Sequence, residues 1–304
     1  MKKGRLGSVI SGIVMHFLKR SLWFCLLSFA CSGLRAADKE ILLIAGSPSH
    51  GPREHEFRAG CLLLGDCLNK MPGIHATVAS NGWPQDVSVF EKADAVFMYC
   101  DGGDAHPAIR PERSKLLDKL AAKGVGIGMA HYAVEVPHGT PGLAMLRWTG
   151  GFYETYWSVN PTWEAHYTKL PEHPVTRGVE PFSIEDEWYY HMLFTPYMQG
   201  VTPILTAVPS PKTVGGDDAH GGNPWVRAEV AKGEPQHMMW VQERANDGRG
   251  FGFTGGHYHE NWGNENFRRL VLNALLWIAH AEVPEKGAQS TLAPGVLKEN
   301  LDPK

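Results

Sequence analysis

Short apolar runs recur along the first half of the chain. Continuous apolar runs of this length are typical of strands that are buried on both faces of a parallel sheet. They lie at residues 40–46, 74–79, 93–99 and 124–130. Two segments with apolar residues at helical spacing, 56–70 and 111–123, lie between them. This alternation predicts an α/β fold with a doubly wound, mainly parallel sheet.

A second group of elements closes the chain. Residues 236–242 have a strand-like pattern, and Asn246-Asp247-Gly248 predicts a hairpin turn into a short strand at 251–254. Residues 265–279 then carry apolar side chains at helical spacing. The order strand, turn, helix is therefore repeated near the C-terminus.

A glycine pair, Gly255 and Gly256, separates the last predicted strand from its helix, and His257 and His259 follow it. Open α/β sheets bind ligands at the carboxyl ends of their strands. Both histidines therefore fall where chemistry is expected. The simpler alternative is that one or both only hydrogen-bond to loop carbonyls.

Histidines follow three predicted strand ends, at His50, His131 and His257. One parallel sheet would gather them on a single rim, and Glu187 would approach from the loops that cover it. Three neutral imidazoles and a carboxylate form a site for zinc or a similar divalent ion, with a position open to water or a sugar oxygen. Without a metal, His131 or His257 would act as base and Glu187 as acid.

The regular rhythm is lost between residues 140 and 233, which predicts an elaborated loop region rich in aromatic residues. Aromatic faces beside carboxylates suit an uncharged ligand with many hydroxyl groups. Packing in the core is the competing explanation for any one aromatic residue. The candidate ligand-binding residues are Tyr132, Glu154, Trp157, Trp188, Tyr189, His259 and Trp262.

Three carboxylates follow one another at Glu185, Asp186 and Glu187. In a strand their side chains alternate, so Glu185 and Glu187 share a face and Asp186 points away. One of the shared pair is a candidate acid or ligand, and a solvated acidic turn is the alternative. The glycine-rich stretch 212–224 is expected to be a surface loop.

The N-terminus has the pattern of a secretory signal. Basic residues precede an apolar stretch at 21–34, and no acidic residue occurs before Asp38. The stretch is shorter than the roughly 20 residues that span a bilayer, so no stable membrane span is expected. We therefore expect residues 1–36 to be a signal peptide and the protein to be exported, to the periplasm or outside the cell. Lipidation at Cys31 is the less favoured alternative, because a lipobox leucine is missing.

The charge balance changes without residues 1–36. They hold 6 of the 29 lysines and arginines and none of the 32 acidic residues, which leaves a net charge of about −9. A nucleic-acid partner needs a basic footprint and is excluded. The remaining length suits one α/β domain over residues 37–283, and the composition of residues 284–304 predicts a loose tail.

The cysteines after residue 36 do not form a disulfide scaffold. Cys61 and Cys67 fall on different faces of one predicted helix, so they are poorly placed to bridge. Cys100 follows the third predicted strand and offers a cysteine-hydrolase mechanism. The neighbouring Asp101 argues against it, because a negative charge raises the pKa of a thiol.

Several motifs, taken in order, resemble the ThuA-like (trehalose utilisation) family over roughly residues 40–280. They lie at 124–131, 173–178, 186–189, 248–257 with Trp262, and 275–277. The resemblance implies a fold like that of the class I glutamine amidotransferases, with His131 where those enzymes carry a cysteine nucleophile. It also implies a link to disaccharide or glycoside catabolism, with a metal ion in some relatives. Gln242 stands where many relatives have a basic residue or histidine.

The leading hypothesis is an exported enzyme that acts on a disaccharide or (keto-)glycoside by hydrolysis, elimination or isomerisation. A divalent metal such as zinc would assist it, and no nucleotide cofactor is expected. The alternative is a non-catalytic carbohydrate-binding protein of the same fold. In that protein Trp157, Trp188, Tyr189 and Trp262 would stack on the sugar.

Overall fold

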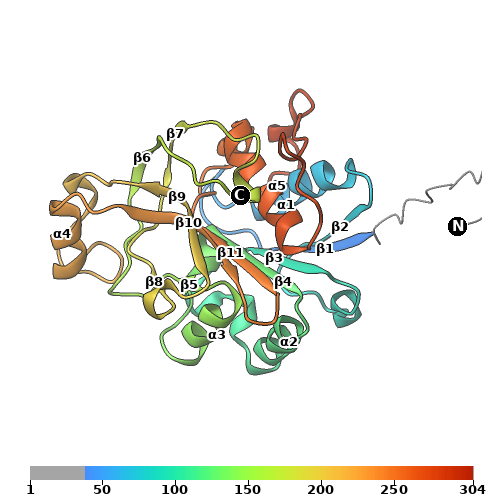
Figure 1. Cartoon of the computed structure of the whole chain (residues 1–304), viewed down its shortest axis with the longest axis horizontal. Coiled ribbons are helices and arrows are strands. Elements are labelled where there is room, and N and C mark those ends of the chain that lie inside the picture. The colour runs from blue at the N-terminus through green and yellow to red at the C-terminus, as the bar shows by residue number, and fades with distance from the viewer. Residues whose placement is uncertain (1–37, 304) are drawn as a thin grey trace, which may run out of the picture. The chain divides into compact units, whose positions relative to one another are not determined.

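A seven-stranded sheet forms the centre of the computed structural model, which describes residues 38–303 (Figure 1). Its strands, in spatial order, are β2 (Ile74–Ala79), β1 (Lys39–Ala45), β3 (Ala95–Tyr99), β4 (Gly126–Ala130), β11 (Arg249–Phe253), β10 (Gln236–Glu243) and β9 (Val201–Ala207). The first five pair in parallel, and β10 runs antiparallel to both of its neighbours. The predicted doubly wound, mainly parallel sheet is confirmed.

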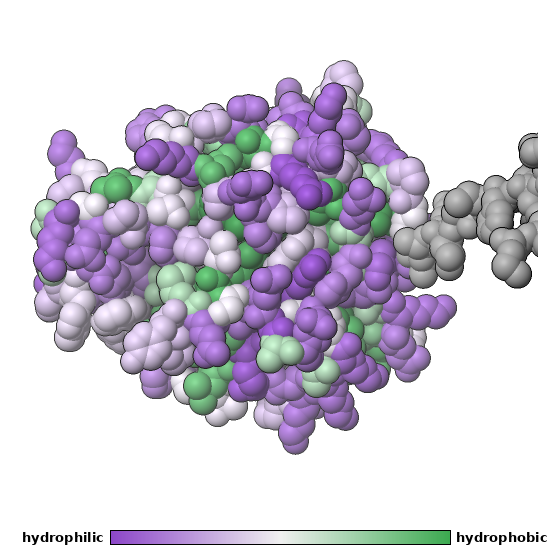
Figure 2. All heavy atoms as spheres, viewed as in Figure 1, coloured by the Kyte–Doolittle hydropathy of each residue, from purple (hydrophilic) through white to green (hydrophobic). Residues whose placement is uncertain are grey.

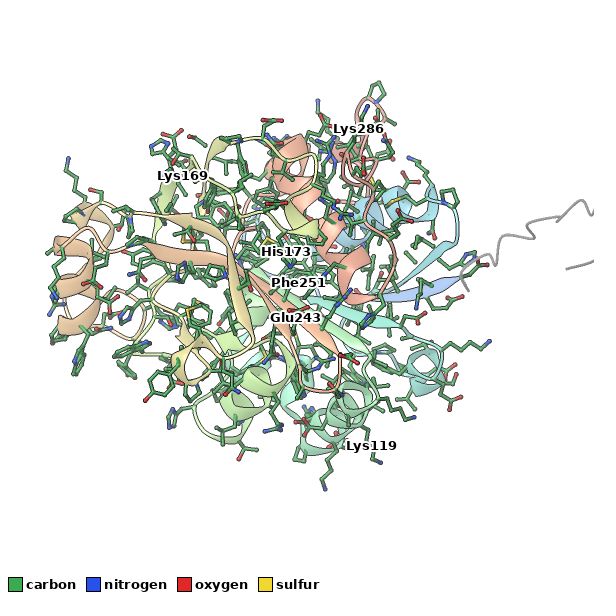
Figure 3. The ribbon with its side chains drawn as sticks, viewed as in Figure 1. Lys119, Lys169, His173, Glu243, Phe251 and Lys286 are labelled. Carbon is green, nitrogen blue, oxygen red and sulfur yellow. The ribbon has the colours of Figure 1, made fainter. Side chains whose placement is uncertain are left out.

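Helices cover both faces of the sheet (Figure 1). They are α1 (Phe57–Asn69) and α5 (Glu265–Ile278) on one face, and α2 (Pro111–Ala122) and α3 (Thr140–Trp148) on the other. Strand β1 shows why the apolar runs are continuous: Leu43 packs into the first layer and Leu42 into the second. Phe251, labelled on the sheet in Figure 3, stacks on Phe97 with ring centroids 5.8 Å apart.

The region 140–233, expected to be loops, contains regular structure. Besides α3 and β9 it holds β5 (Gly151–Phe152), β6 (Thr162–Tyr167), β7 (Phe182–Glu187), β8 (Leu193–Phe194) and α4 (Pro224–Ala231). β5 pairs with β8, and β6 with β7, outside the main sheet. The sequence does not predict β9 as a strand because β9 contains Pro203, and proline is disfavoured in central strands. It is tolerated here because β9 is an edge strand.

The motif at residues 173–178 ties the chain to α5. The side-chain amide of Asn273 donates to the carbonyl oxygens of Val175 and Arg177, each at 2.9 Å. Gly178 has φ of 67°, and a Cβ there would lie 1.9 Å from a carbonyl oxygen of the C-terminal segment. Only glycine fits this position, so the motif has a structural role.

The segment after α5 is anchored, although its composition predicts a loose tail. Arg58 of α1 pairs with Asp302 at 3.3 Å. The backbone N–H of Asp302 donates to Glu56 Oε2 at 2.7 Å, directly beside His55. Contacts made by single side chains and backbone groups leave no trace in composition, and the prediction missed them for that reason.

The predicted signal sequence at residues 1–36, with Cys31, lies outside the described residues. Within residues 38–303, no helix combines the length and apolar character needed to cross a membrane. The face of the molecule in Figure 2 is mainly hydrophilic, with apolar side chains in small groups. Cys61, Cys67 and Cys100 are free and buried, as expected for a chain that is not a disulfide scaffold.

Candidate functional site

Three histidines and a glutamate converge at the carboxyl end of the sheet. His131 follows β4, His257 follows β11, His55 precedes α1, and Glu187 ends β7. Nε2 of His55 lies 2.9 Å from His131 Nε2 and 3.0 Å from His257 Nδ1. Oε2 of Glu187 lies 3.1 Å from His257 Nδ1 and 3.5 Å from His131 Nε2. We call these four residues the histidine cluster.

Three of the four predicted metal ligands belong to the histidine cluster, and His50 does not. Its place is taken by His55, which lies in the same loop. The ring of His50 stacks on that of His55 at 3.6 Å between centroids. Asp101 Oδ1 lies 3.5 Å from His55 Nδ1, on the side of the ring away from the cluster. The strand-end rule identifies the loop correctly but does not distinguish between its two histidines.

His131 is held in one tautomer. Its Nδ1 lies 3.0 Å from the carbonyl oxygen of Thr254, which can only accept, so Nδ1 carries the proton and Nε2 directs its lone pair into the cluster. The ring is fully buried. Burial lowers the pKa of His131 well below its usual value, and neighbouring His55 adds to this effect. His131 is therefore a neutral imidazole, the form that binds a metal.

The pKa of His257 is shifted in the opposite direction to that of His131. Burial alone would lower its pKa, but the hydrogen bond and charge of Glu187, with the charges of Asp186 and Glu54, raise the pKa above its usual value. The hydrogen bond joins His257 Nδ1 to Glu187. Glu187 therefore contacts two histidines that differ in protonation: His131 is neutral, and His257 is readily protonated.

The backbone at this site is strained. His50, His55 and His131 all have left-handed φ angles, of 61°, 46° and 52°. Such angles are uncommon for residues other than glycine, and each costs on the order of 1–3 kcal/mol. They persist where the surrounding structure fixes the chain. Strain gathered on three histidines of one rim is typical of a functional site.

Asp186 joins β7 to the loop that carries His257. Its side chain is fully buried and accepts hydrogen bonds from the backbone N–H groups of Gly256 (2.8 Å), His257 (3.0 Å) and Glu187 (2.8 Å). The amide of Asn261 donates to it as well, at 2.9 Å. The alternation of the strand correctly turns Asp186 away from Glu187, but it does not predict this supporting role.

Glu187 also contacts polar groups outside the cluster. The hydroxyl of Tyr189 donates to Oε2 at 3.2 Å, and the amide of Asn160 donates to Oε1 at 3.2 Å. The side chain of Glu187 is 19% exposed, whereas that of His131 is fully buried. Of Glu187 and His131, Glu187 is therefore the residue that solvent or a ligand can reach.

The predicted ligand-binding aromatics divide between core and site. Trp188 and Trp262 are fully buried in the core; Trp188 packs on Phe253 at 5.6 Å between centroids, and Trp262 on Tyr99 at 5.8 Å. Core packing, the competing explanation, describes both. Tyr189 does lie in the site, through its hydrogen bond to Glu187.

The remaining predicted residues lie around the cluster. Tyr132 is half-buried with its ring 6.0 Å from that of His55, and burial raises its pKa to about 12. Glu154 pairs with the exposed His138, and Trp157 lies among other aromatic rings. His259 is buried, and its backbone N–H donates to the carbonyl oxygen of Arg53 in the His50–His55 loop. Tyr132 is thus in ring contact with a residue of the histidine cluster.

The donors of the histidine cluster fit a divalent cation. Two nitrogens on one tetrahedral zinc ion lie about 3.3 Å apart, since each Zn–N bond is about 2.0–2.1 Å long. Nε2 of His55 is 2.9 and 3.0 Å from nitrogens of His131 and His257. A single N–H on His55 cannot point directly at both, whereas a cation between the three nitrogens would meet all their lone pairs once His257 Nδ1 has lost the proton that it shares with Glu187. Imidazole nitrogens and a carboxylate oxygen are donors that suit zinc and similar divalent ions.

The cysteines offer no competing nucleophile. Burial raises the pKa of Cys100 well above its usual value, and the charge of Asp101 raises it further. We expect Cys61, Cys67 and Cys100 to react with a thiol reagent at least about 100-fold more slowly in the native protein than in denaturant. Mass spectrometry of the labelled chain identifies the modified sites. Rapid labelling of Cys100 alone would instead support a cysteine hydrolase.

Comparison with known proteins identifies the fold. The family model described as trehalose utilisation, ThuA, matches residues 52–278. The chain belongs to the ThuA family. The resemblance seen in the sequence motifs is thereby confirmed, and with it a family connection to trehalose utilisation. No curated protein matches the ThuA-family chain.

Solved structures of ThuA-like proteins share this fold. A ThuA-like protein from Bacteroides uniformis is 17% identical with a TM-score of 0.56, covering 80% of this chain and 93% of its own. Another, from Parabacteroides merdae, is 18% identical with a TM-score of 0.55, covering 84% of this chain and 96% of its own. At these identities the similarity concerns the fold alone.

Proposed function

We propose that this ThuA-family chain is an exported enzyme that breaks down a disaccharide or an oxidised (keto) glycoside with the help of a divalent metal, zinc in the first instance. The observation that carries the proposal is the convergence of three imidazoles and a carboxylate at the strand ends. His55, His131 and His257 would hold the ion. Glu187 would lie beside the position left for water or a sugar oxygen.

The residues of the site have separate tasks in this proposal. A metal bound here would supply Lewis acidity toward a carbonyl or water oxygen. Thr254 keeps His131 in the ligating tautomer, and Asp186 fixes the backbone that carries His257. Glu187, oriented by the Tyr189 hydroxyl, takes or gives a proton at Oε2. The partners expected are small sugars.

Metal analysis and a turnover assay on the same purified protein test this proposal. We expect about one zinc ion per chain, and consumption of trehalose or of trehalose carrying a ketone on one ring. A chelator should remove the metal and the activity together. Activity that survives complete loss of metal would contradict the metal-assisted mechanism. Calorimetric binding of these sugars without any product would instead favour the carbohydrate-binding alternative.

A further inference from the structure

A buried carboxylate lies beside the histidine cluster without belonging to it. Glu135 directly follows the short 3-10 helix that begins at His131, and its side chain is 5% exposed. Its Oε1 lies 3.2 Å from Nε2 of His220 and accepts a hydrogen bond from the Thr155 hydroxyl at 3.4 Å. Burial raises the pKa of Glu135, and His220 and Thr155 oppose this rise only in part.

His220 comes from the glycine-rich loop that the sequence marks only as a surface loop. The loop is docked: the backbone N–H of Asn160 donates to the His220 carbonyl at 3.3 Å, and that of Tyr156 to the Ala219 carbonyl at 2.8 Å. Asp218 Oδ1 accepts from the His220 N–H at 3.0 Å. The side chain of His220 is 41% exposed, and among the described residues no hydrogen bond involves its Nδ1. Nδ1 therefore remains available to a ligand.

A layer of tyrosines connects this pair to the histidine cluster. The ring of His220 stacks on Tyr153 at 5.7 Å between centroids, and Tyr153 packs edge-on against Tyr189 at 5.3 Å. The hydroxyl of Tyr189 donates to Glu187. Burial and then the charges of both Glu135 and Glu187 raise the pKa of Tyr153 and Tyr189. Both carboxylates thus act electrostatically on the same two tyrosines.

We infer that His220 is a catalytic residue that gives a proton to the glycosidic oxygen of a sugar bound at the histidine cluster, and that Glu135 is its positioning residue. Glu135 accepts the Nε2–H of the protonated ring, which leaves the proton on Nδ1 for transfer. The inference rests on the proposed function, because it assigns a second role at the same site.

Elimination and hydrolysis break the same C–O bond. The bond between C1 and the glycosidic oxygen breaks, its electron pair stays on that oxygen, and the proton moves there from His220 Nδ1. In an elimination beside a C3 ketone, a base removes the C2 proton and that electron pair forms the C1–C2 double bond. In a hydrolysis, the oxygen of water forms the new bond to C1, and Glu187, the proton-transfer group of the proposed function, takes the proton that this water loses. His220 is left neutral and is protonated again from solvent.

Leaving-group dependence tests the inference. The variants are His220→Asn and Glu135→Gln, which keep similar shapes. The substrates are trehalose oxidised at C3 on one ring and the 4-nitrophenyl glycoside of the same keto sugar. We expect kcat for the disaccharide to fall about 100-fold in both variants. With the nitrophenyl glycoside, kcat should stay close to that of the unmodified protein, because nitrophenolate leaves without a proton.

A matched control lies in the same region. Glu229 approaches another histidine, with Oε1 3.4 Å from His191 Nε2, and Glu229→Gln should leave both rates unchanged. Equal losses with both substrates would show that His220 and Glu135 only hold the loop, and no loss would also overturn the inference. If the unmodified protein consumes neither substrate, the proposed function itself fails. Zinc content should be the same in all variants.

Discussion

Replacing Asp186 with alanine is expected to lower the free energy of unfolding by about 4 kcal/mol. The change leaves the backbone N–H groups of Gly256, His257 and Glu187 without their acceptor, and each unsatisfied buried donor costs about 1–3 kcal/mol. For a chain of this size, about 4 kcal/mol corresponds to a fall in Tm of roughly 10 °C. Denaturant unfolding measures the first quantity and a thermal melt the second.

Glu185→Ala is the matched control for this prediction. Glu185 lies one position earlier on the same strand, and its side chain is exposed. Its removal should change the free energy of unfolding by less than about 0.5 kcal/mol. An Asp186→Ala protein as stable as the Glu185→Ala protein would show that the loop after β11 does not depend on this carboxylate.

Zinc is expected to stabilise the protein, and His257→Ala should abolish that effect. At a free zinc concentration about 1,000 times its Kd, binding to the native state alone adds roughly 4 kcal/mol to the free energy of unfolding. His257 supplies a central donor, because its Nδ1 lies within 3.1 Å of both His55 and Glu187. Unfolding curves with and without zinc measure the difference.

Two variants sharpen this second prediction. His138 is not a member of the histidine cluster and its side chain is 85% exposed, so His138→Ala should keep the whole zinc effect. Glu187→Gln should keep most of it and lose turnover, because Glu187 is assigned to proton transfer and the imidazoles to the ion. Loss of zinc binding in Glu187→Gln would make the carboxylate a ligand, and an undiminished zinc effect in His257→Ala would place the ion elsewhere.

The central sheet could be predicted because its signal is local. The apolar runs at 40–46 and 124–130 correspond to β1 and β4 within two residues, since a strand covered by helices on both faces needs no polar alternation. β9 and the β6–β7 ribbon could not be found in this way. Pro203 interrupts the first, and the second alternates exposed and buried residues within a stretch crowded with aromatics.

The site residues that follow strand ends could be predicted from the sequence. The site residues whose positions depend on how a loop folds could not. His131 directly follows β4, and His257 lies four residues after the end of β11, so topology brings them together. The choice of His55 over His50 is set by backbone angles in a loop with no regular pattern. His220 lies 85 positions from Glu135, and their contact depends on how one loop docks on another. Neither segment alone has a sequence pattern that predicts this contact.

The anchoring of Asp302 makes the site depend on a segment that is distant from it in the sequence. Glu56 accepts one hydrogen bond from Arg53, in the loop that carries His55, and another from the backbone of Asp302. The second donor lies 246 positions after Glu56 in the sequence. The loop around His55 therefore completes its hydrogen bonds only when the segment around Asp302 has docked, and a variant cut before Asp302 would leave that loop without one of its supports.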